Sequence, residues 1–212
     1  MSIARLSAMQ PPSNIIYLAS KSPRRRELLK QIDVHYELLL MREVAPRVDI
    51  DESPQYGESP HAYVERVVKA KAQIALKVLR ERKLTPRPIL TADTTVTFDG
   101  EILGKPLDRD DAVRILKRLS GQTHQVLTAV MLTTGDDDYH TLTTSFVTFS
   151  PLSEDQIRQY VDTGEPMDKA GAYGVQGRAA RFISKLSGSY SGVVGLPLFE
   201  TAGLLRQAGV QI

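Results

Sequence analysis

Residues 17–31, YLASKSPRRRELLKQ, combine a strand, a polar turn and the start of a helix. The apolar run IIYLA, residues 15–19, predicts a buried strand, and Ser22 followed by Pro23 is typical of a helix N-terminus. Arg24, Arg25 and Arg26 then occupy the first helical turn, where the helix dipole disfavours cations by about 0.3–1 kcal/mol. Three unfavourable charges in one turn indicate a function rather than a stabilising role, so we hypothesise that a polyanion binds at this turn.

The remaining sequence alternates between strand and helix patterns, which predicts an α/β fold in a single domain, residues 15–212, preceded by a loose polar arm, residues 1–14. A long loop rich in Pro, Asp and Glu is expected from residue 41 to 60. The predicted elements after it are a helix over 61–82, a strand PILTAD, a hairpin VTFDGEIL turning at Asp99-Gly100, a helix over 108–119, two paired strands HQVLTAVML and HTLTTSFVTFS, a helix that begins at the capping box of Ser153, and a helix from Pro197.

Composition limits the class of protein. The 212 residues are 42% hydrophobic and 25% charged, which is ordinary for a soluble globular domain. A net charge of +2 gives no basic field for nucleic acid, and the absence of cysteine excludes disulfides and thiolate chemistry. We find no secretory signal and no apolar run of membrane-spanning length, and therefore expect a cytoplasmic protein without nucleic-acid or membrane partners.

The predicted turn after the first strand is the first candidate phosphate site. Free N–H groups at a helix N-terminus bind anions, and Ser20, Arg24 and Arg25 add donors suited to phosphate oxygens. A solvated basic surface is the alternative. Lys105, in EILGKP, is a further candidate phosphate ligand, although its spacing and the following Pro exclude a P-loop.

Two charged residues lie in apolar surroundings. Lys71 falls at the centre of a helical stripe of valines, where we expect its charge to point into a cleft, the alternative being a lysine that packs its stem and extends its head to solvent. Asp93 lies where the apolar strand PILTAD is expected to end, and ligands in open α/β sheets gather at the carboxyl ends of strands. Asp93 is therefore a candidate general base or metal ligand, or alternatively a turn cap.

Other catalytic templates are excluded. GSYSG has serines at the wrong positions for a nucleophile elbow, the four histidines lack zinc-ligand spacing, and GAYGVQG is not a dinucleotide fingerprint. A metal would therefore be hard and bound by oxygen, Mg²⁺ or Mn²⁺, held by carboxylates together with substrate phosphates. The acidic stretch VDIDE, which ends at Glu52, can supply one carboxylate or can simply be solvated.

Six segments in order resemble the Maf-type nucleoside triphosphate pyrophosphatases: SKSPRRRELL, ESPHAYVERVVKAKA, ADTTVTFDGEILGKP, LSGQTHQVLTAV, EPMDKAGAYGVQG and GSYSGVVGLPLFET. The resemblance spans about residues 15–205. It implies a fold similar to the inosine triphosphate pyrophosphatases (the Maf/Ham1 fold), with a central mixed twisted sheet flanked by helices and two lobes around a cleft. It also implies a homodimer that uses a divalent metal to hydrolyse a nucleoside triphosphate to the monophosphate and pyrophosphate.

The resemblance also implies roles for individual residues. Asp93 would be catalytic, and the triphosphate would be bound by Ser20, Arg24, Arg25, Lys71 and Lys105. Glu52 and Asp93 would hold the metal, although MREVAPR, residues 41–47, is an apparent insertion just before Glu52.

Substrate specificity in the family is associated with the positions of Arg24, Thr94 and Gln176. The threonine and glutamine resemble the subgroup that acts on dTTP and UTP, and one carboxamide can both donate to O4 of uracil or thymine and accept from N3–H. The alternatives left open are modified pyrimidine triphosphates, 7-methyl-GTP, and a regulator of division and septum formation that binds nucleic acid without hydrolysis.

Overall fold

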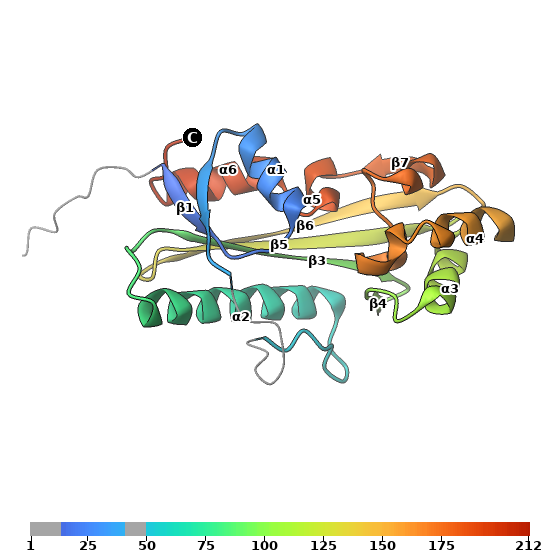
Figure 1. Ribbon diagram of the computed structural model, residues 1–212, viewed down its shortest axis with the longest axis horizontal. Coiled ribbons are helices and arrows are strands. Elements are labelled where there is room, and N and C mark those ends of the chain that lie inside the picture. The colour runs from blue at the N-terminus through green and yellow to red at the C-terminus, as the bar shows by residue number, and fades with distance from the viewer. Residues whose placement is uncertain (1–13, 41–49) are drawn as a thin grey trace, which may run out of the picture.

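The computed structural model describes residues 14–40 and 50–212 (Figure 1). The expected N-terminal arm, except Asn14, and the apparent insertion at 41–47 lie outside these residues. The strands are β1 (Ile15–Leu18), β2 (His35–Leu38), β3 (Ile89–Phe98), β4 (Glu101–Leu103), β5 (Thr123–Thr133), β6 (Asp138–Phe149) and β7 (Ile183–Ser187). The helices are α1 (Pro23–Gln31), α2 (Pro60–Glu81), α3 (Arg109–Leu119), α4 (Glu154–Asp162), α5 (Tyr190–Val194) and α6 (Leu198–Gln207), with short 3₁₀ helices η1 (Glu165–Asp168), η2 (Ala170–Ala172) and η3 (Arg178–Phe182).

The described strands form one mixed sheet in the order β2-β1-β3-β5-β6-β7, and β4 pairs with the far end of β3. β1 runs parallel to β2 and β3, whereas β3, β5, β6 and β7 pair antiparallel in succession. This arrangement confirms the expected α/β class with a central mixed sheet.

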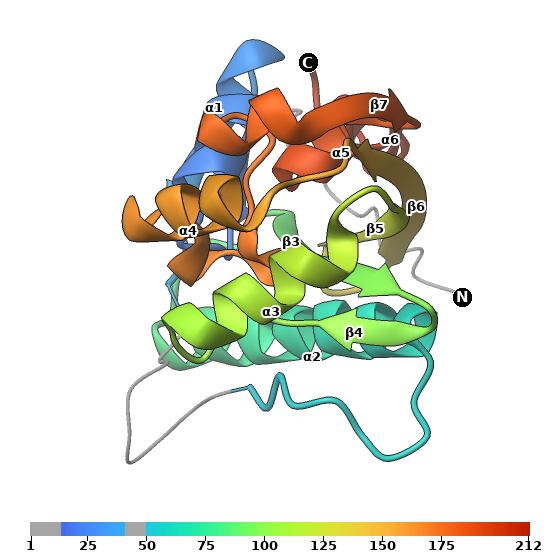
Figure 2. The same cartoon turned by 90° about the vertical axis from the view of Figure 1, so that its right-hand side faces the viewer.

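Helices cover both faces of this sheet. α2 lies along one face, and α1, α5 and α6 lie on the other (Figures 1 and 2). The valines predicted to form the apolar stripe of α2 are buried, and α2 packs against β3 and β5, so that stripe is confirmed. A second core forms at the opposite end of the sheet from β1, where α3 and α4 pack on the ends of β5 and β6. Among the helices that the structure describes, none combines the length and apolar character needed to cross a membrane.

The two edges of β3 differ in how far they pair with neighbouring strands, and one of them has a stretch that no described strand covers. One edge pairs with β5 without interruption from Ile89 to Thr97. The other edge pairs with β1 only at Ile89 and Leu90, and with β4 only from Val96 onward. Within the described residues, the stretch of this edge between Leu90 and Val96 has no partner strand, so the edge of the central strand is open there.

The predicted position of Asp93 at the end of a strand is wrong. β3 is one continuous ten-residue strand, and Asp93 is its fifth residue. The β-branched Thr94, Thr95 and Val96 continue the extended backbone past the aspartate, because such side chains fit a pleated sheet. The strand that ends near Asp93 is its neighbour β1, whose last residue, Leu18, pairs with Leu90.

Helix termini follow the sequence signals closely. The hydroxyl of Ser59 caps α2, the carboxylate of Asp108 caps α3, and Ser153 with Gln156 forms the predicted capping box of α4. At α1, Ser22 occupies the N-cap position as expected but its side chain makes no capping hydrogen bond.

An aromatic cluster holds a buried histidine in the second core. His124 of β5 is 2% exposed, and its ring packs edge-on against Phe149 and Tyr173 with centroids 5.2 and 5.3 Å away. Its Nε2 lies 2.8 Å from the hydroxyl of Tyr173, and its Nδ1 has no hydrogen-bond partner among the described residues. Burial lowers the pKa of His124 to about 4.

This buried histidine predicts a loss of stability in mild acid. The unfolded chain binds a proton on His124 near pH 6.5, whereas the folded chain does so only near pH 4, so stability falls as pH falls between these values. We expect the free energy of unfolding of the wild type to decrease between about pH 7 and pH 5 by about 2 kcal/mol more than that of His124→Gln. Urea titrations of both proteins at the two pH values measure this difference.

The matched control is His61→Gln, because His61 is exposed on the first turn of α2. That variant should follow the wild-type profile. Identical pH profiles for wild type and His124→Gln would show that His124 is not the group responsible.

Candidate active site

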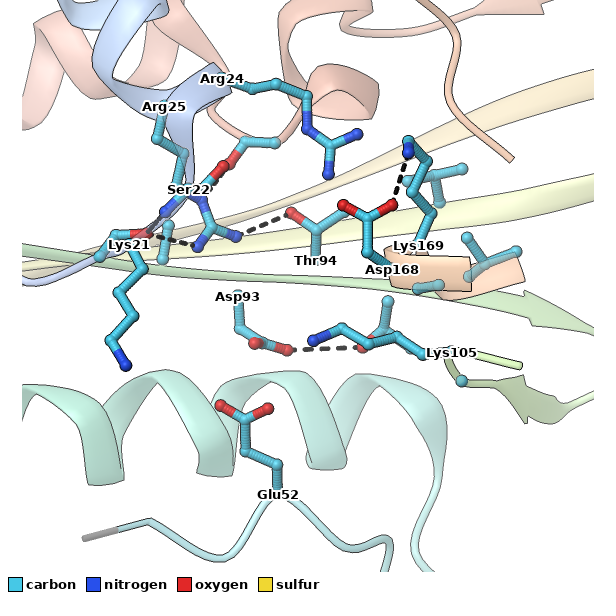
Figure 3. Close-up of a pocket in the computed structure, with 18 of the residues that line it drawn as sticks. Lys21, Ser22, Arg24, Arg25, Glu52, Asp93, Thr94, Lys105, Asp168 and Lys169 are labelled. Carbon is cyan, nitrogen blue, oxygen red and sulfur yellow. Dashed lines mark hydrogen bonds and ion pairs between the residues drawn. The ribbon is translucent and has the colours of Figure 1, made fainter. Parts of the chain in front are cut away.

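A cavity of about 1180 Å³ opens at the unpaired edge of β3. Its lining comes from the turn after β1, the segment before α2, the middle of α2 and β3, the end of β4, and the stretch from η1 to α5. All nine residues predicted for the site line this cavity: Ser20, Arg24, Arg25, Glu52, Lys71, Asp93, Thr94, Lys105 and Gln176. Residues up to 156 positions apart in sequence are therefore brought together as predicted, and Figure 3 shows many of them around the cavity.

Lys71 stands at the centre of the charged part of this cavity. Its Nζ lies 2.7 Å from Oδ1 of Asp93 and 2.7 Å from Oε1 of Glu52, and its side chain is only 13% exposed. The expectation that this charge points from the apolar stripe into a cleft is therefore confirmed. Two carboxylates from separate elements converge on one ammonium, which compensates the cost of burying it.

The surroundings of Glu52 favour its charged form. Burial acts to raise the pKa of Glu52, but the charge of Lys71 and its hydrogen bond outweigh burial, so the pKa lies below its ordinary value. Lys105 and Arg25 add to this lowering through their charges. Figure 3 shows Lys105 extending toward Asp93 from the far side of the cavity.

Arg25 stabilises the turn that is predicted to bind phosphate. Its Nε donates to the carbonyl of Gly195 at 2.8 Å, and its two terminal nitrogens donate to the hydroxyls of Ser20 and Thr94, each at 3.2 Å. Burial lowers the pKa of Arg25, and the negative charge of Asp93 opposes that change. Arg25 thus connects α1, β3 and the loop after α5 while it lines the cavity.

The turn keeps backbone donors available for an anion. The hydroxyl of Ser20 accepts from the backbone N–H of Ser22 at 3.2 Å as well as from Arg25. The carbonyl of Ser22 accepts from the N–H of Arg26 at 3.4 Å, but its side chain does not cap α1, so the N–H groups of Arg24 and Arg25 receive no side-chain cap from Ser22. A helix start of this kind is suited to binding phosphate.

Thr94 and Asp93 point to opposite faces of β3. Successive residues of a strand alternate between faces, so the carboxylate of Asp93 faces α2 and the hydroxyl of Thr94 faces α1 and α5. The hydroxyl of Thr128 on β5 donates to the carbonyl of Gly192 at 2.8 Å, and its oxygen lies 3.1 Å from the hydroxyl of Thr94. This network fixes the position of Thr94 from the side opposite Arg25.

Asp168 and Lys169 line the cavity, and sequence reasoning missed both. Lys169 Nζ lies 2.6 Å from the carboxylate of Asp168 and 2.6 Å from the carbonyl of Glu165. Partial burial acts to raise the pKa of Asp168, but Lys169 and Arg24 lower it. The available signal was an adjacent pair of opposite charges inside the glycine-rich segment EPMDKAGAYGVQG.

Glu165 anchors the loop that carries Gln176. Its carboxylate accepts from the hydroxyl of Tyr160 and from the backbone N–H of Arg178, each at 3.0 Å. A Cβ atom placed on Gly177 would lie 2.0 Å from this carboxylate, so glycine is required for so close an approach. Gln176, immediately before this contact, is exposed and lines the cavity.

The donor set suits a hard cation with few protein ligands. Within residues 14–40 and 50–212, no group of three or more His, Asp or Glu side chains is arranged to hold a metal ion. Glu52 and Asp93 nevertheless approach each other closely enough to share Lys71, and both present only oxygen. Mg²⁺ and Mn²⁺ accept such sites when substrate phosphates and water complete the coordination, so the residues present fit the predicted metal.

This chain is similar to known proteins over most of its length. Residues 15–208 match the sequence model of the family described as Maf-like protein. A protein of Dechloromonas aromatica (strain RCB) named dTTP/UTP pyrophosphatase is 54% identical over 195 residues, covering 92% of this chain and 97% of its own. A protein of the same name from Nitrosomonas europaea is 51% identical over 203 residues, covering 95% and 98%.

A solved structure of the Staphylococcus aureus Ham1 protein is similar with 17% sequence identity and a TM-score of 0.46, covering 79% of this chain and 90% of the other. The family assignment depends on the sequence matches, which extend over nearly the full length of this chain and of its relatives. The chain belongs to the Maf-like protein family.

Proposed function

We propose that this protein is a nucleoside triphosphate pyrophosphatase that hydrolyses dTTP and UTP to the monophosphate and pyrophosphate. Relatives more than 50% identical over nearly their whole length carry the name dTTP/UTP pyrophosphatase. The observation that carries the proposal is the cavity at the open edge of β3, in which one buried aspartate is surrounded by cationic side chains from four segments.

The triphosphate lies across the turn from Ser20 to Arg25, in this proposal. The start of α1 offers backbone N–H groups, and Arg24 adds a planar donor suited to phosphate oxygens. Arg25 keeps its internal bonds and contributes its charge. Lys71 and Lys105 neutralise the phosphates from the opposite side. The negative charge of the triphosphate offsets the mutual repulsion of the cationic side chains at this turn.

Asp93 orients the attacking water. Its Oδ1 is held by Lys71, and the hydroxyl of Thr95 lies 3.5 Å from its Oδ2, so the carboxylate has a defined orientation. The water oxygen forms a bond to the α-phosphorus as the bond from that phosphorus to the bridging oxygen breaks. The water proton passes to Asp93, and pyrophosphate leaves. Positioning and charge stabilisation supply most of the catalysis in reactions of this kind.

Glu52 and Asp93 would hold the divalent cation, Mg²⁺ or Mn²⁺, in this site. When bound, the cation supplies positive charge to the phosphate oxygens and withdraws electron density from the α-phosphorus. The same two carboxylates bind the ammonium of Lys71 in the described structure, so one pair of carboxylates would bind both a cation of the protein and the metal ion.

The carboxamide of Gln176 reads the base. Uracil and thymine present acceptor, donor and acceptor groups in order, and one carboxamide can pair with O4 and N3–H together. Glu165 and Gly177 hold the loop of Gln176 at the mouth of the cavity. Thr94 and Arg24 flank the same space from the floor and from α1.

Replacing Asp93 by Asn tests the chemistry. We expect kcat for pyrophosphate release from UTP with Mg²⁺ to fall by about 100-fold or more, because the amide cannot accept the proton of water. Asp136→Asn, in the exposed turn between β5 and β6, is the matched control and should retain wild-type activity. Thermal unfolding establishes that both variants are folded, and substantial turnover by a folded Asp93→Asn would remove Asp93 from the catalytic role.

Replacing Gln176 by Glu tests base recognition. We expect kcat/KM for dTTP and UTP to fall by about tenfold or more, since a carboxylate cannot donate to O4, while 7-methyl-GTP is much less affected. Gln73→Glu, on the exposed side of α2, adds the same charge outside the cavity and serves as the control. Equal losses for all three nucleotides would show that Gln176 does not contact the base.

A further inference from the structure

Residues 51–59, here called the Glu52 segment, connect the carboxylate of Glu52 to the start of α2 without any helix or strand. Residues 51–57 of this segment are exposed, so no hydrophobic burial fixes their path. Yet the Glu52 carboxylate lies 2.7 Å from Lys71, opposite Asp93. Some other interaction must fix the position of the Glu52 backbone relative to α2.

Two side chains on adjacent turns of α2 bind three successive carbonyl groups of this segment. The hydroxyl of Tyr63 donates to the carbonyl of Glu52 at 2.9 Å. Arg66, three residues later on the same helix face, donates to the carbonyls on either side of it: Ser53 at 3.0 Å and Asp51 at 3.4 Å. The backbone on both sides of Glu52 is therefore bound to the helix that also carries Lys71.

The same arginine closes the segment at its other end. Its Nε and Nη2 donate to the two carboxylate oxygens of Glu58 at 2.6 and 2.8 Å, a bidentate pair. This hydrogen bonding, chiefly from Arg66, lowers the pKa of Glu58 to about 2. Glu58 also accepts from the backbone N–H of Gln55 at 3.0 Å, which folds the segment back on itself.

We propose that Tyr63 and Arg66 are positioning residues, which place the carboxylate of Glu52 at the cavity by fixing the backbone around it. The inference rests on the proposed function, because it assigns these residues to the placement of a carboxylate that acts in that reaction. Neither side chain is proposed to touch the reacting atoms. Their effect passes through Glu52, since a misplacement of about 1 Å can cost about 100-fold in rate.

Arg66→Lys is the principal test variant. Lysine keeps the charge but cannot bind Glu58 in a bidentate manner and also reach two carbonyls. We expect kcat/KM for UTP to fall by about tenfold. Hydrogen exchange of the backbone amides of Ser53, Gln55 and Glu58, which are bonded within the segment, should become faster.

Arg118→Lys is the matched control. The exposed fraction of the Arg118 side chain is 30%, against 28% for Arg66. Like Arg66, Arg118 pairs with one glutamate, Glu101, and lies over one aromatic ring, that of Phe98. It lies outside the cavity lining, so Arg118→Lys should leave both the kcat/KM and the exchange of the Glu52 segment unchanged.

A double-variant cycle separates positioning from general stability. If Arg66 acts through Glu52, Arg66→Lys should have no further effect on kcat/KM in a Glu52→Gln background. A purely structural arginine would reduce kcat/KM equally in both backgrounds, and that result would overturn the inference. Tyr63→Phe, which removes only the hydroxyl, should show the same dependence on Glu52 with a loss of about threefold, and it carries the test if Arg66→Lys does not fold.

The two proposals fail in different ways. A wild-type protein that releases no pyrophosphate from any nucleoside triphosphate would overturn the proposed function, whereas faster exchange in Arg66→Lys alone would still support the anchoring. Unchanged exchange of the Glu52 segment in both Arg66→Lys and Tyr63→Phe would overturn the inference even in an active enzyme.

Discussion

The unequal pairing of β3 is the constraint on which the site depends. Along one edge this strand is bonded continuously to β5, which makes it a rigid support. Along the other edge, β1 ends after two paired residues and β4 begins only at Val96, so no strand of residues 14–40 and 50–212 pairs with the middle of β3 there. A long antiparallel partner and a short parallel neighbour together produce a cavity whose floor is held by the continuous pairing of β3 with β5.

The charged side chains around the cavity form two groups, one on the side of α2 and one on the side of α1, rather than a single basic surface. On the α2 side, Lys71 is held between Asp93 and Glu52, and a buried ammonium without such partners would be strongly unfavourable. On the α1 side, Arg25 is held by a carbonyl and two hydroxyls, and no carboxylate of the described residues contacts its guanidinium. The side of the cavity that faces α1 is therefore the more receptive to an anion.

Much of this arrangement could be predicted from local patterns. The spacing of valines on α2 indicated that Lys71 points inward, and the capping box of Ser153 gave an accurate start for α4, because such signals act within a few residues. The nine proposed site residues follow from motifs whose spacing matches the family, and all nine line one cavity. Their chemical roles remain predictions.

What escaped prediction depends on contacts between distant segments. The internal bonding of Arg25 requires the carbonyl of Gly195, 170 residues away. The continuity of β3 beyond Asp93 depends on β5, and the short elements β7 and α5 are stabilised by neighbours rather than by their own periodicity. Asp168 and Lys169 were missed because a charged pair beside glycines has no distinctive local signature.

The opposite orientation of two neighbouring residues on β3 has an evolutionary consequence. Asp93 is supported by α2, whereas Thr94 is supported by α1, β5 and the α5 loop, so different sets of packing neighbours constrain each position. Substitutions in the layer behind Thr94 can alter the side of the cavity proposed to bind the nucleobase without disturbing the carboxylate of Asp93, which is proposed to activate water on the opposite face. A lineage can in this way diversify its choice of nucleotide while its hydrolytic machinery stays unchanged.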